Sequence, residues 1–441
     1  MLVNIHKHAG ALFVMLMLTL LIPVQAQTLS LQQCIDSALV HNKNLEINKN
    51  NIRISEERHK EVVSNLIPKV NINSDYKYYI EQPTQLVPMS MLGGAEGKYK
   101  EVQMGVPHNI TANVQVTVPL FNAQVFGNMK TTKIATELSG IQHRKTEEQL
   151  YYEVSNLYYN AQVMEKQIAY IDSNLINSRK LHKNIKLLYE QLMVKKSDVD
   201  KVELDIMQLE TQRETLNDKL DQVMNTLKFM MGIPMETDLR VEKNIRLIAN
   251  ANYMVRTPLD IQLLQTQNKL LNSELTTIKN SRLPSLVLFG SYGKLGYGYD
   301  KKPNDFLDFY DVALVGIQLN IPVFNGTSTQ RKINQKRMEI TNNRLQSDLL
   351  DEQMNIQRKN AHNQKTTALQ TVYNTAEQIK LSQKIYDQTI LQQKEGTATL
   401  TDVLMADNSL RTSQQNYLVA VVDFLKADLE LKKLTGNITT K

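Results

Sequence analysis

The chain has 441 residues, with 51 Lys and Arg against 45 Asp and Glu, one cysteine and no tryptophan. A net charge of +6 is small for this length, and no basic cluster stands out, so the sequence gives no sign of nucleic-acid binding. The single cysteine, Cys34, excludes an intrachain disulfide, and we expect it to be a small apolar residue on a helix.

The first 26 residues have the pattern of a secretory signal peptide. A polar start is followed by an apolar stretch, 9–22, and by a small-residue cleavage site that ends at Ala26. A retained membrane anchor is the alternative, but the apolar stretch is short for a span, and Ser30 with Gln33 predicts that a helix begins directly afterwards. We see no later apolar run long enough to cross a bilayer as a helix, so any membrane part is expected to consist of strands.

Four segments alternate between apolar and polar side chains over about ten residues, the length of strands that span a bilayer when tilted. We place them at about 69–79, 110–118, 285–293 and 312–321. The loops at about 80–109 and 294–311 are expected to be exposed. An aromatic girdle is predicted towards these loops from Tyr76, Tyr78, Tyr79, Tyr292, Tyr297, Tyr299 and Tyr310. A soluble four-stranded sheet would show the same alternation.

Proline residues indicate where the helices end. The stretches between 120 and 233 and after 322 contain no proline, so both are predicted to be nearly unbroken helix, including one over 327–395. In each half, a helix is expected to end before a first proline and the next helix to begin after a second one. These prolines are Pro68 and Pro119 in the first half, and Pro284 and Pro322 in the second.

The last stretch of the chain repeats an earlier one at a distance of 204 residues. In both copies, seam positions step by three and four, which predicts left-handed coiled-coil packing. The predicted seams are Val199, Val202, Ile206, Leu209, Arg213, Leu216, Leu220, Val223, Leu227 and Met230, and then Val403, Ala406, Leu410, Ser413, Tyr417, Ala420, Phe424, Ala427, Leu431 and Leu434. The duplication predicts a first helix–strand–strand–helix repeat at 27–240, a connecting segment at 241–256 and a second repeat at 257–441.

Four strands are too few to close a barrel, and open edges would leave backbone polar groups facing lipid. Other copies of the chain must therefore complete the strands. Two copies give eight strands, whose lumen is filled by side chains, whereas three copies give twelve around an open pore. The predicted fold is mainly α with a small β part: internally duplicated long antiparallel coiled-coil helices that form an α-barrel, plus four strands per protomer in a 12-stranded trimeric transmembrane β-barrel.

The duplicated plan resembles the TolC family of outer-membrane efflux proteins, as do the junctions at 118–122 (Val-Pro-Leu-Phe-Asn) and 321–325 (Ile-Pro-Val-Phe-Asn) and the segment 396–404. The resemblance implies a homotrimeric outer-membrane exit duct of a tripartite efflux or secretion system, a passive conduit from periplasm to exterior that is gated at its periplasmic helix tips. The implied partners are a periplasmic adaptor protein, an inner-membrane pump or transporter, and outer-membrane lipid. The implied location is the outer membrane of a Gram-negative bacterium, with a long periplasmic extension and no cofactor.

The resemblance also implies a gate. In this family, aspartates at the helix turns line a constriction, and Asp402 matches the first of them, whereas Met405 stands at the second position. Ser197 and Asp198 match a Thr-Asp pair that locks the closed entrance. The positions of that pair's Tyr and Arg partners carry Gln393 and Ala398, so the lock is expected to be weakened or built differently.

The family's adaptor-contacting tips match two turns of this chain. The implied contact residues are Glu395, Gly396 and Thr397 in the second repeat, and Gln191, Leu192 and Met193 in the first, where Leu192 replaces the usual glycine.

The residues alone allow a second interpretation of Asp198 and Asp402. A carboxylate in the first turn of a helix caps that turn and interacts favourably with the helix dipole. Three copies of Asp402 around a three-fold axis would instead form a negative ring that favours cations. Both interpretations stay open at this point.

Two other classes of protein were weighed. A secreted or envelope coiled-coil structural or adhesion protein without transport activity would explain the heptads, but not four bilayer-length strands at matching places. An enzyme is not expected, because the histidines show no metal-ligand spacing and no nucleophile motif appears. The many Asp and Glu residues are expected on solvated helical faces.

Overall fold

A computed structural model describes residues 27–247, 253–299 and 308–439. The predicted signal peptide, 1–26, lies outside these residues, as do parts of the connecting segment and of the second loop. The chain divides into two units by contacts. Unit 1 comprises Met1–Asn50, Ile141–Leu263 and Ser347–Lys441, and unit 2 comprises Asn51–Gly140 and Leu264–Gln346. Each unit takes segments from both halves of the sequence, so the boundaries of the two repeats stay a prediction.

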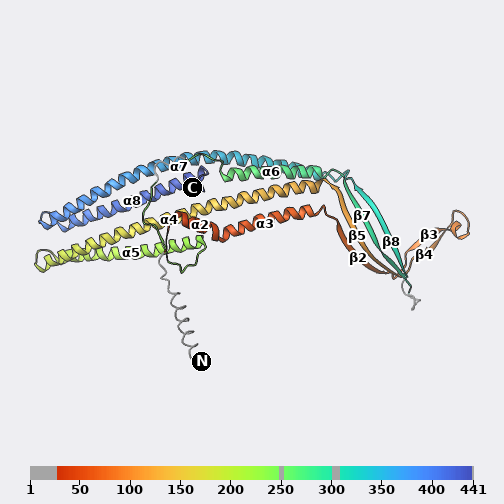
Figure 1. Ribbon diagram of the computed structural model, residues 1–441, viewed down its shortest axis with the longest axis horizontal. Helices are drawn as coiled ribbons and strands as arrows, with labels where there is room; N and C mark the ends of the chain where they lie inside the picture. Colours follow the sequence, from red (N-terminus) through yellow and green to blue (C-terminus); the bar gives the residue numbers. More distant parts are fainter. Residues whose placement is uncertain (1–26, 248–252, 300–307, 440–441) are drawn as a thin grey trace, which may run out of the picture. The chain divides into compact units, whose positions relative to one another are not determined.

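Unit 2 contains the four-stranded sheet that the alternation predicts. Its strands are β2 (Lys69–Tyr78), β5 (His108–Asn122), β7 (Ser285–Gly298) and β8 (Asp308–Asn320). They lie in the order β2-β5-β7-β8, and every neighbouring pair is antiparallel. β2 and β8 are therefore the edge strands of the sheet. Figure 1 shows the sheet with its labels.

Three strands extend beyond their expected bounds, and one of them is β8, which begins at Asp308 rather than at about 312. β5 continues through Pro119 to Asn122, where a helix was expected to begin after the proline. The sheet accommodates this proline because the pairing of β5 with β7 shifts register between Pro119 and Phe121, and a proline without an N–H is tolerated at such an irregularity. β7 continues through Lys294 to Gly298, in a segment predicted to be loop.

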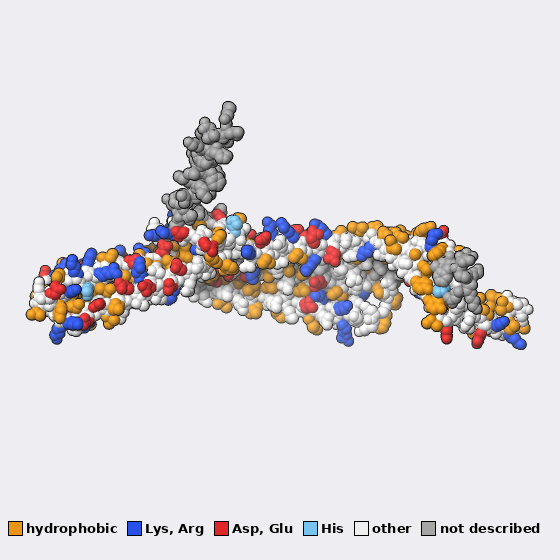
Figure 2. Space-filling view, turned by 90° about the horizontal axis from the view of Figure 1, so that it is seen from below, with side chains coloured by type: hydrophobic (Ala, Val, Ile, Leu, Met, Phe, Trp, Pro, Cys, Tyr) orange, Lys and Arg blue, Asp and Glu red, His pale blue; other side chains and the backbone are white. Residues whose placement is uncertain are grey.

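The sheet exposes many of its apolar side chains in this single chain. On the edge strand β8, the side chains of Val315, Ile317 and Leu319 are exposed, and on β2 so are those of Val70 and Ile72. Figure 2 shows hydrophobic side chains over the sheet, and charged side chains of both signs over the helices. Apolar surface on this scale marks a face that contacts lipid or another protein chain.

The first loop between strands has structure of its own. It contains a small antiparallel sheet of β3 (Thr84–Pro88) and β4 (Tyr99–Gln103), with a short 3₁₀ turn, η1 (Met89–Leu92), after β3. This hairpin lacks the strict alternation of the four long strands, so the sequence analysis treated it as loop. The aromatic girdle stays a prediction.

The two strand-to-helix junctions of unit 2 differ, although their sequences match. β5 passes directly into α4 (Ala123–Glu190), whose first turn is capped by Asn122: its Oδ1 accepts from the N–H of Gln124 at 3.0 Å. After β8, seven residues precede α7 (Ser328–Lys394). This connection includes Gly326 and Thr327, both in the left-handed backbone region with φ of 64° and 67°.

Two further helices lead into the sheet, at the first residues of β2 and β7. α3 (Lys43–Ser64) ends just before Pro68, and α6 (Leu259–Asn280) ends just before Pro284. The last turns close in the same way: the N–H of Ile67 donates to Ser64 O, and that of Leu283 donates to Asn280 O, both at 3.0 Å. The predicted helix ends before Pro68 and Pro284 are therefore confirmed.

Unit 1 contains two helical hairpins. In Figure 1, α4 lies beside α5 (Lys196–Met231), and α7 lies beside α8 (Leu400–Leu434). Near the turns of the hairpins, residues of all four helices share one apolar core, which includes Ile185, Val202, Tyr386 and Val403. Burial of this core is what holds the two hairpins together there.

Most of the predicted seam residues are buried, including Leu227 of α5 and Ala420, Phe424, Ala427, Leu431 and Leu434 of α8, but the seam departs locally from the heptads. Val202, Leu209 and Leu216 of α5 are buried seven residues apart, but the series continues at Met224 and Met231 rather than at the predicted Val223 and Met230. In α8, Leu418 is buried in place of the predicted Tyr417. A straight helix has 3.6 residues per turn rather than 3.5, so a strict heptad pattern falls behind by about one residue over several turns.

The first residues that the structure describes are tied into unit 1. β1 (Gln27–Leu29) pairs in parallel with β6 (Leu239–Val241), and α2 (Leu31–His41) follows. The predicted start of this helix is confirmed: Ser30 N donates to Gln33 Oε1 at 2.9 Å, and Gln33 N donates to Ser30 Oγ. Cys34 is fully buried in the apolar core beneath it, and burial raises its pKa to about 12.

Candidate functional site at the helix tips

The two helical hairpins turn in the same way, exactly one repeat length apart. In the first turn, the N–H groups of Leu192 and Met193 donate to Tyr189 O and Leu188 O, both at 2.9 Å. In the second, those of Gly396 and Thr397 donate to Gln393 O and Gln392 O at 3.1 and 2.9 Å. Each donor and acceptor has its counterpart 204 positions away. This pattern is a Schellman motif, which satisfies the last carbonyl groups of a helix.

The residue at the bend is in the left-handed region in both turns, with φ of 67° at Leu192 and 75° at Gly396. Glycine adopts this conformation freely, whereas a Cβ makes it costly. The Leu192 side chain is 91% exposed, so burial does not repay that cost in this chain.

We expect Leu192→Gly to stabilise the protein slightly, by up to about 1 kcal/mol, because glycine removes the strain at φ > 0 but has more freedom in the unfolded chain. The matched change Gly396→Ala should destabilise it by a similar amount, since nothing but conformation opposes a Cβ there. Thermal unfolding followed by circular dichroism measures both. If both substitutions lowered the midpoint temperature, the assignment of strain to Leu192 would be wrong.

The structure brings the two predicted tips together. Leu188 and Val194 flank the first turn, Ile390 and Leu400 flank the second, and all four belong to the same apolar core. The six predicted contact residues themselves are exposed: Gln191, Leu192, Met193, Glu395, Gly396 and Thr397.

Asp402 is the third residue of α8 and takes part in a reciprocal cap. The N–H and the hydroxyl of Thr399 donate to Asp402 Oδ2 at 2.8 and 2.7 Å, and Asp402 N donates to Thr399 Oγ1 at 3.2 Å. These hydrogen bonds, the one from the hydroxyl first, lower the pKa of Asp402. The capping interpretation is therefore realised at Asp402, and its exposed carboxylate keeps a negative charge at the tip.

Asp198 occupies the equivalent position in α5 but does not cap it. The residue before this helix is Lys195, which offers no side-chain acceptor, and Asp198 Oδ1 pairs instead with Lys201 Nζ at 3.1 Å. Ser197 and Met405 are exposed, and Gln393 is half-buried. Across the described part of the chain, no side-chain hydrogen bond joins Ser197 or Asp198 to Gln393.

A buried ionic cluster, which no sequence pattern predicted, lies further along the same helices. Arg411 of α8 donates from Nη1 and Nη2 to the two carboxylate oxygens of Asp205 of α5, at 2.6 and 2.7 Å. Its Nη2 also donates to Ser178 Oγ of α4 at 3.0 Å and pairs with Asp407 Oδ2 of α8. Ser178 Oγ in turn donates to Asp205 Oδ2 at 2.9 Å. We call Asp205, Arg411 and Asp407 the ionic cluster.

The electrostatics of the ionic cluster are unbalanced, because one guanidinium faces two carboxylates. Asp407 is only 5% exposed. Burial raises its pKa to about 6, against the opposing effect of Arg411, and the charge of Asp205 adds to the rise. The expectation that the acidic residues lie on solvated faces is thus wrong for Asp407. Its position next to the seam residue Ala406 is the signal that could have found it.

A second buried ion pair, Lys365 with Asp428, contacts Tyr253 of the predicted connecting segment. Tyr253 donates to Asp428 Oδ1 at 2.6 Å, and Lys365 Nζ lies 2.7 Å from the same oxygen. Lys365 also lies over the Tyr253 ring, 4.8 Å from its centroid. These contacts join the segment after the first repeat to α7 and α8, far from the tips in sequence.

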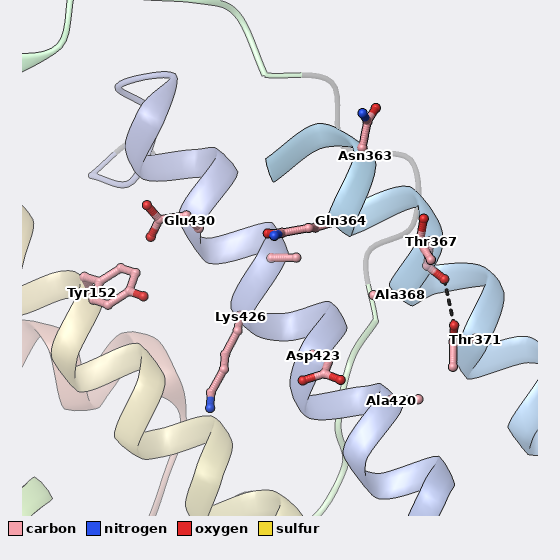
Figure 3. Close-up of a pocket in the computed structure, with 11 residues that line it drawn as sticks. Tyr152, Asn363, Gln364, Thr367, Ala368, Thr371, Ala420, Asp423, Lys426 and Glu430 are labelled. Atoms are coloured by element: carbon pink, nitrogen blue, oxygen red, sulfur yellow. Dashed lines mark hydrogen bonds between the residues drawn. The ribbon is translucent and has the colours of Figure 1, made fainter. Parts of the chain in front are cut away.

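Cavities in unit 1 are open grooves lined by both polar and apolar side chains. One of these grooves has a volume of about 680 Å³ and lies along α7 and α8, with Tyr152 of α4 at one side. Figure 3 shows Asp423, Lys426 and Glu430 around it, together with the helix-internal hydrogen bond from Thr371 to Thr367. Among the described residues, no group of three His, Cys, Asp or Glu could hold a metal ion. No helix in the described ranges is both long and apolar enough to cross a membrane.

Comparisons with known proteins agree with this arrangement. Residues 260–437 match the family model of the outer membrane efflux proteins. The outer membrane efflux protein BepC of Brucella suis biovar 1 (strain 1330) is 28% identical over 129 residues. That alignment covers 29% of this chain and only 28% of BepC, so the chain spans little of that relative's length.

Solved structures match over almost the whole chain. The outer membrane protein VceC of Vibrio cholerae has a TM-score of 0.72 at 12% identity, over 92% of this chain and 96% of VceC. The CmeC outer membrane channel of Campylobacter jejuni has 0.73 at 11% identity, over 92% and 85%. The open state of the MtrE channel of Neisseria gonorrhoeae has 0.70 at 15% identity, over 92% and 88%. At these identities the likeness establishes the fold, and the predicted mainly helical class with a small β part is confirmed. The second half of the chain is therefore similar to the outer membrane efflux proteins, and the whole chain shares the fold of these outer membrane channels.

Proposed function

We propose that this protein is the outer-membrane exit duct of a tripartite efflux or secretion system. The observation that carries the proposal is the four-stranded sheet, whose edge strands β2 and β8 have no partner strand within the described chain and whose apolar side chains are exposed. A sheet of this kind requires other strands at both edges. The outer membrane is the location to which the family match points.

The assembly that we propose is a homotrimer. Three copies of the sheet, joined edge to edge, supply twelve strands, which leaves an open lumen. The long helices of the three copies would continue the conduit into the periplasm. Because a conduit carries what its pump delivers, it needs no enclosed substrate pocket, and the open grooves of unit 1 are consistent with that.

The proposed partners are a periplasmic adaptor protein and an inner-membrane pump or transporter. The adaptor would contact the two tips, where Leu192 and Met193 of the first turn and Glu395 and Thr397 of the second are exposed. Site-specific photocrosslinking from position 397 in intact cells would capture that adaptor. Capture of no periplasmic protein from position 397 or from position 193 would contradict the tip assignment.

The test of the conduit itself is assembly and conductance. We expect the detergent-solubilised full chain to be trimeric by light scattering and to form ion-conducting pores in planar bilayers. A monomer that is stable in buffer without detergent and shows no conductance would overturn the proposal.

We further propose that Asp402 forms part of the gate. Three copies of its carboxylate near the three-fold axis would make a negative ring that attracts cations. Asp402→Ala pores are therefore expected to lose cation selectivity or block by divalent cations. Asp402→Asn removes the charge but leaves an oxygen that can accept from Thr399, so it separates the charge from the cap. Asp198→Asn is the control, and selectivity unchanged in Asp402→Ala would refute the gate assignment.

A further inference from the structure

The ionic cluster joins two hairpins that would have to separate if the tips opened. Ser178 and Asp205 belong to the α4–α5 hairpin, and Asp407 and Arg411 belong to α8. The guanidinium of Arg411 therefore links the two hairpins directly, and a buried hydrogen bond from Asn174 Nδ2 of α4 to Gln414 Oε1 of α8, at 3.0 Å, is a second, uncharged link. Asp407 follows Asp402 by five residues on α8, so it is roughly 7–8 Å along the helix from the proposed gate.

The polar groups in the ionic cluster are only partly satisfied. Asp407 Oδ1 and Arg411 Nε are both buried without a hydrogen-bond partner. An unpaired buried oxygen of a carboxylate is costly, and the cost falls when the carboxyl is protonated and neutral. The ionic cluster therefore exists in two charge states: a net charge of −1 when Asp407 is ionised, and neutral when it is protonated.

The groups that face Asp407 come from several helices. Arg411 is on its own helix, Asp205 is on α5, and Tyr386 is on α7, with Asp387 of α7 acting on Tyr386. α4 contributes the hydroxyl of Ser178. Burial, and then the charge of Asp407, raises the pKa of Tyr386 to about 12, so Tyr386 stays neutral at physiological pH. Asp407 is thus the member of the group whose charge changes in mildly acidic solution.

We propose that Asp205, Arg411 and Asp407 form a proton-responsive latch, which holds the two hairpins together next to the tips; this inference rests on the proposed function. Protonation of Asp407 leaves a neutral pair of Asp205 and Arg411, which favours the packed hairpins. Ionisation of Asp407 adds a second buried carboxylate, which favours their separation and the exposure of that carboxylate to water.

The direction of the pH effect follows from the pKa. In the packed state it is about 6, against an ordinary value of 3.8 for an exposed aspartate. The contribution of Asp407 to the stability of the packed hairpins is therefore complete below about pH 4. It decreases as the pH rises to 6, and the stability changes no further above that pH. Because each pH unit in that window changes the ratio of packed to separated hairpins up to tenfold, the whole window changes it by roughly 100-fold.

Conductance of the full-length pores in planar bilayers, titrated from pH 4 to 8, tests the latch. We expect the wild-type open probability to rise up to about pH 6 and then level off. Asp407→Asn, which resembles the protonated form, should hold the pores closed at every pH. Asp205→Asn, which removes the ion pair between the hairpins and leaves only neutral hydrogen-bond acceptors for Arg411 there, should shift the pores towards the open state. Asp172→Asn is the matched control, because Asp172 forms an exposed ion pair between α4 and α5 with Arg213, at 2.6 Å.

A distance measurement tests the same point without conductance. Spin labels at Leu204→Cys on α5 and Asn408→Cys on α8, both exposed positions, are compared in a Cys34→Ala background diluted with unlabelled chains. Electron–electron resonance should show the distance lengthening between pH 4 and 6 in the otherwise wild-type protein, but not with Asp407→Asn.

The two results separate the latch from the proposed function. If wild-type protein does not conduct at all, the conduit is wrong, and the distances still decide whether the hairpins respond to protons. If it conducts with the same pH dependence as Asp407→Asn, and the label distances of the two also agree, the latch is wrong and the conduit stands.

Discussion

Replacing Arg411 with methionine is expected to destabilise the helical hairpins by about 3–5 kcal/mol. The substitution keeps most of the side-chain volume but leaves Asp205 and Asp407 without their shared cation, and both carboxylates are largely buried. Denaturation by urea at neutral pH, followed by circular dichroism, measures the loss. The loss should shrink as the pH falls below 6, because Asp407 is then protonated in the packed state.

Two further variants decide the cause. The triple change Arg411→Met, Asp205→Asn and Asp407→Asn removes every charge of the ionic cluster and should recover most of the lost stability. Arg213→Met breaks the exposed pair with Asp172 and should cost no more than about 1 kcal/mol. If Arg411→Met were no worse than Arg213→Met, the ionic cluster would contribute little to the packing of the hairpins.

Gly232→Ala is expected to cost considerably more than the equivalent change Gly436→Ala. Both glycines end a helix in the left-handed region, with φ of 66° and 69°, and they stand one repeat length apart. An alanine costs about 1–2 kcal/mol at either site from conformation alone. At Gly232, however, the added Cβ would lie 2.4 Å from the carbonyl oxygen of His41, whereas at Gly436 its nearest neighbour is Arg256 Cβ at 3.2 Å. Overpacking adds about 1–3 kcal/mol at the first site.

Thermal unfolding of the two alanine variants measures this difference directly. The shared conformation makes Gly436→Ala an internal control for the strain at φ > 0. Equal losses at both sites would mean that α2 shifts without cost and that its close approach to Gly232 is unimportant.

The sequence was sufficient for the fold because the fold depends on strong local signals. Alternation over ten residues indicated all four long strands, and Pro68 and Pro284 marked where α3 and α6 stop. The prediction that β5 ends at Pro119 was wrong, because a register shift in the pairing of β5 with β7 accommodates the proline. Such a shift depends on the neighbouring strand and cannot be predicted from local sequence. The buried seam departs from the predicted positions only locally, at Met224 and Met231 of α5 and at Leu418 of α8, because the helices pack at their natural period over part of their length.

The candidate site was only partly visible in the sequence. The turn residues and Asp402 could be placed, because the two repeats align at a fixed spacing and local capping follows from Thr399 and Asp402. The ionic cluster could not be placed, because Asp205 and Arg411 lie 206 residues apart and meet only when the two hairpins pack. A single charged residue beside a seam does not reveal its distant counter-charge.

The unequal junctions between strands and helices have a mechanical consequence. β5 continues into α4 without a break, so a twist of α4 about its own axis is transmitted as torque to the middle of the sheet. α7 is joined to β8 through seven residues outside both elements, among them Gly326 and Thr327, so a twist of α7 is coupled to its strand less directly. The junction of β5 with α4 therefore couples helix and sheet more directly than the junction of β8 with α7.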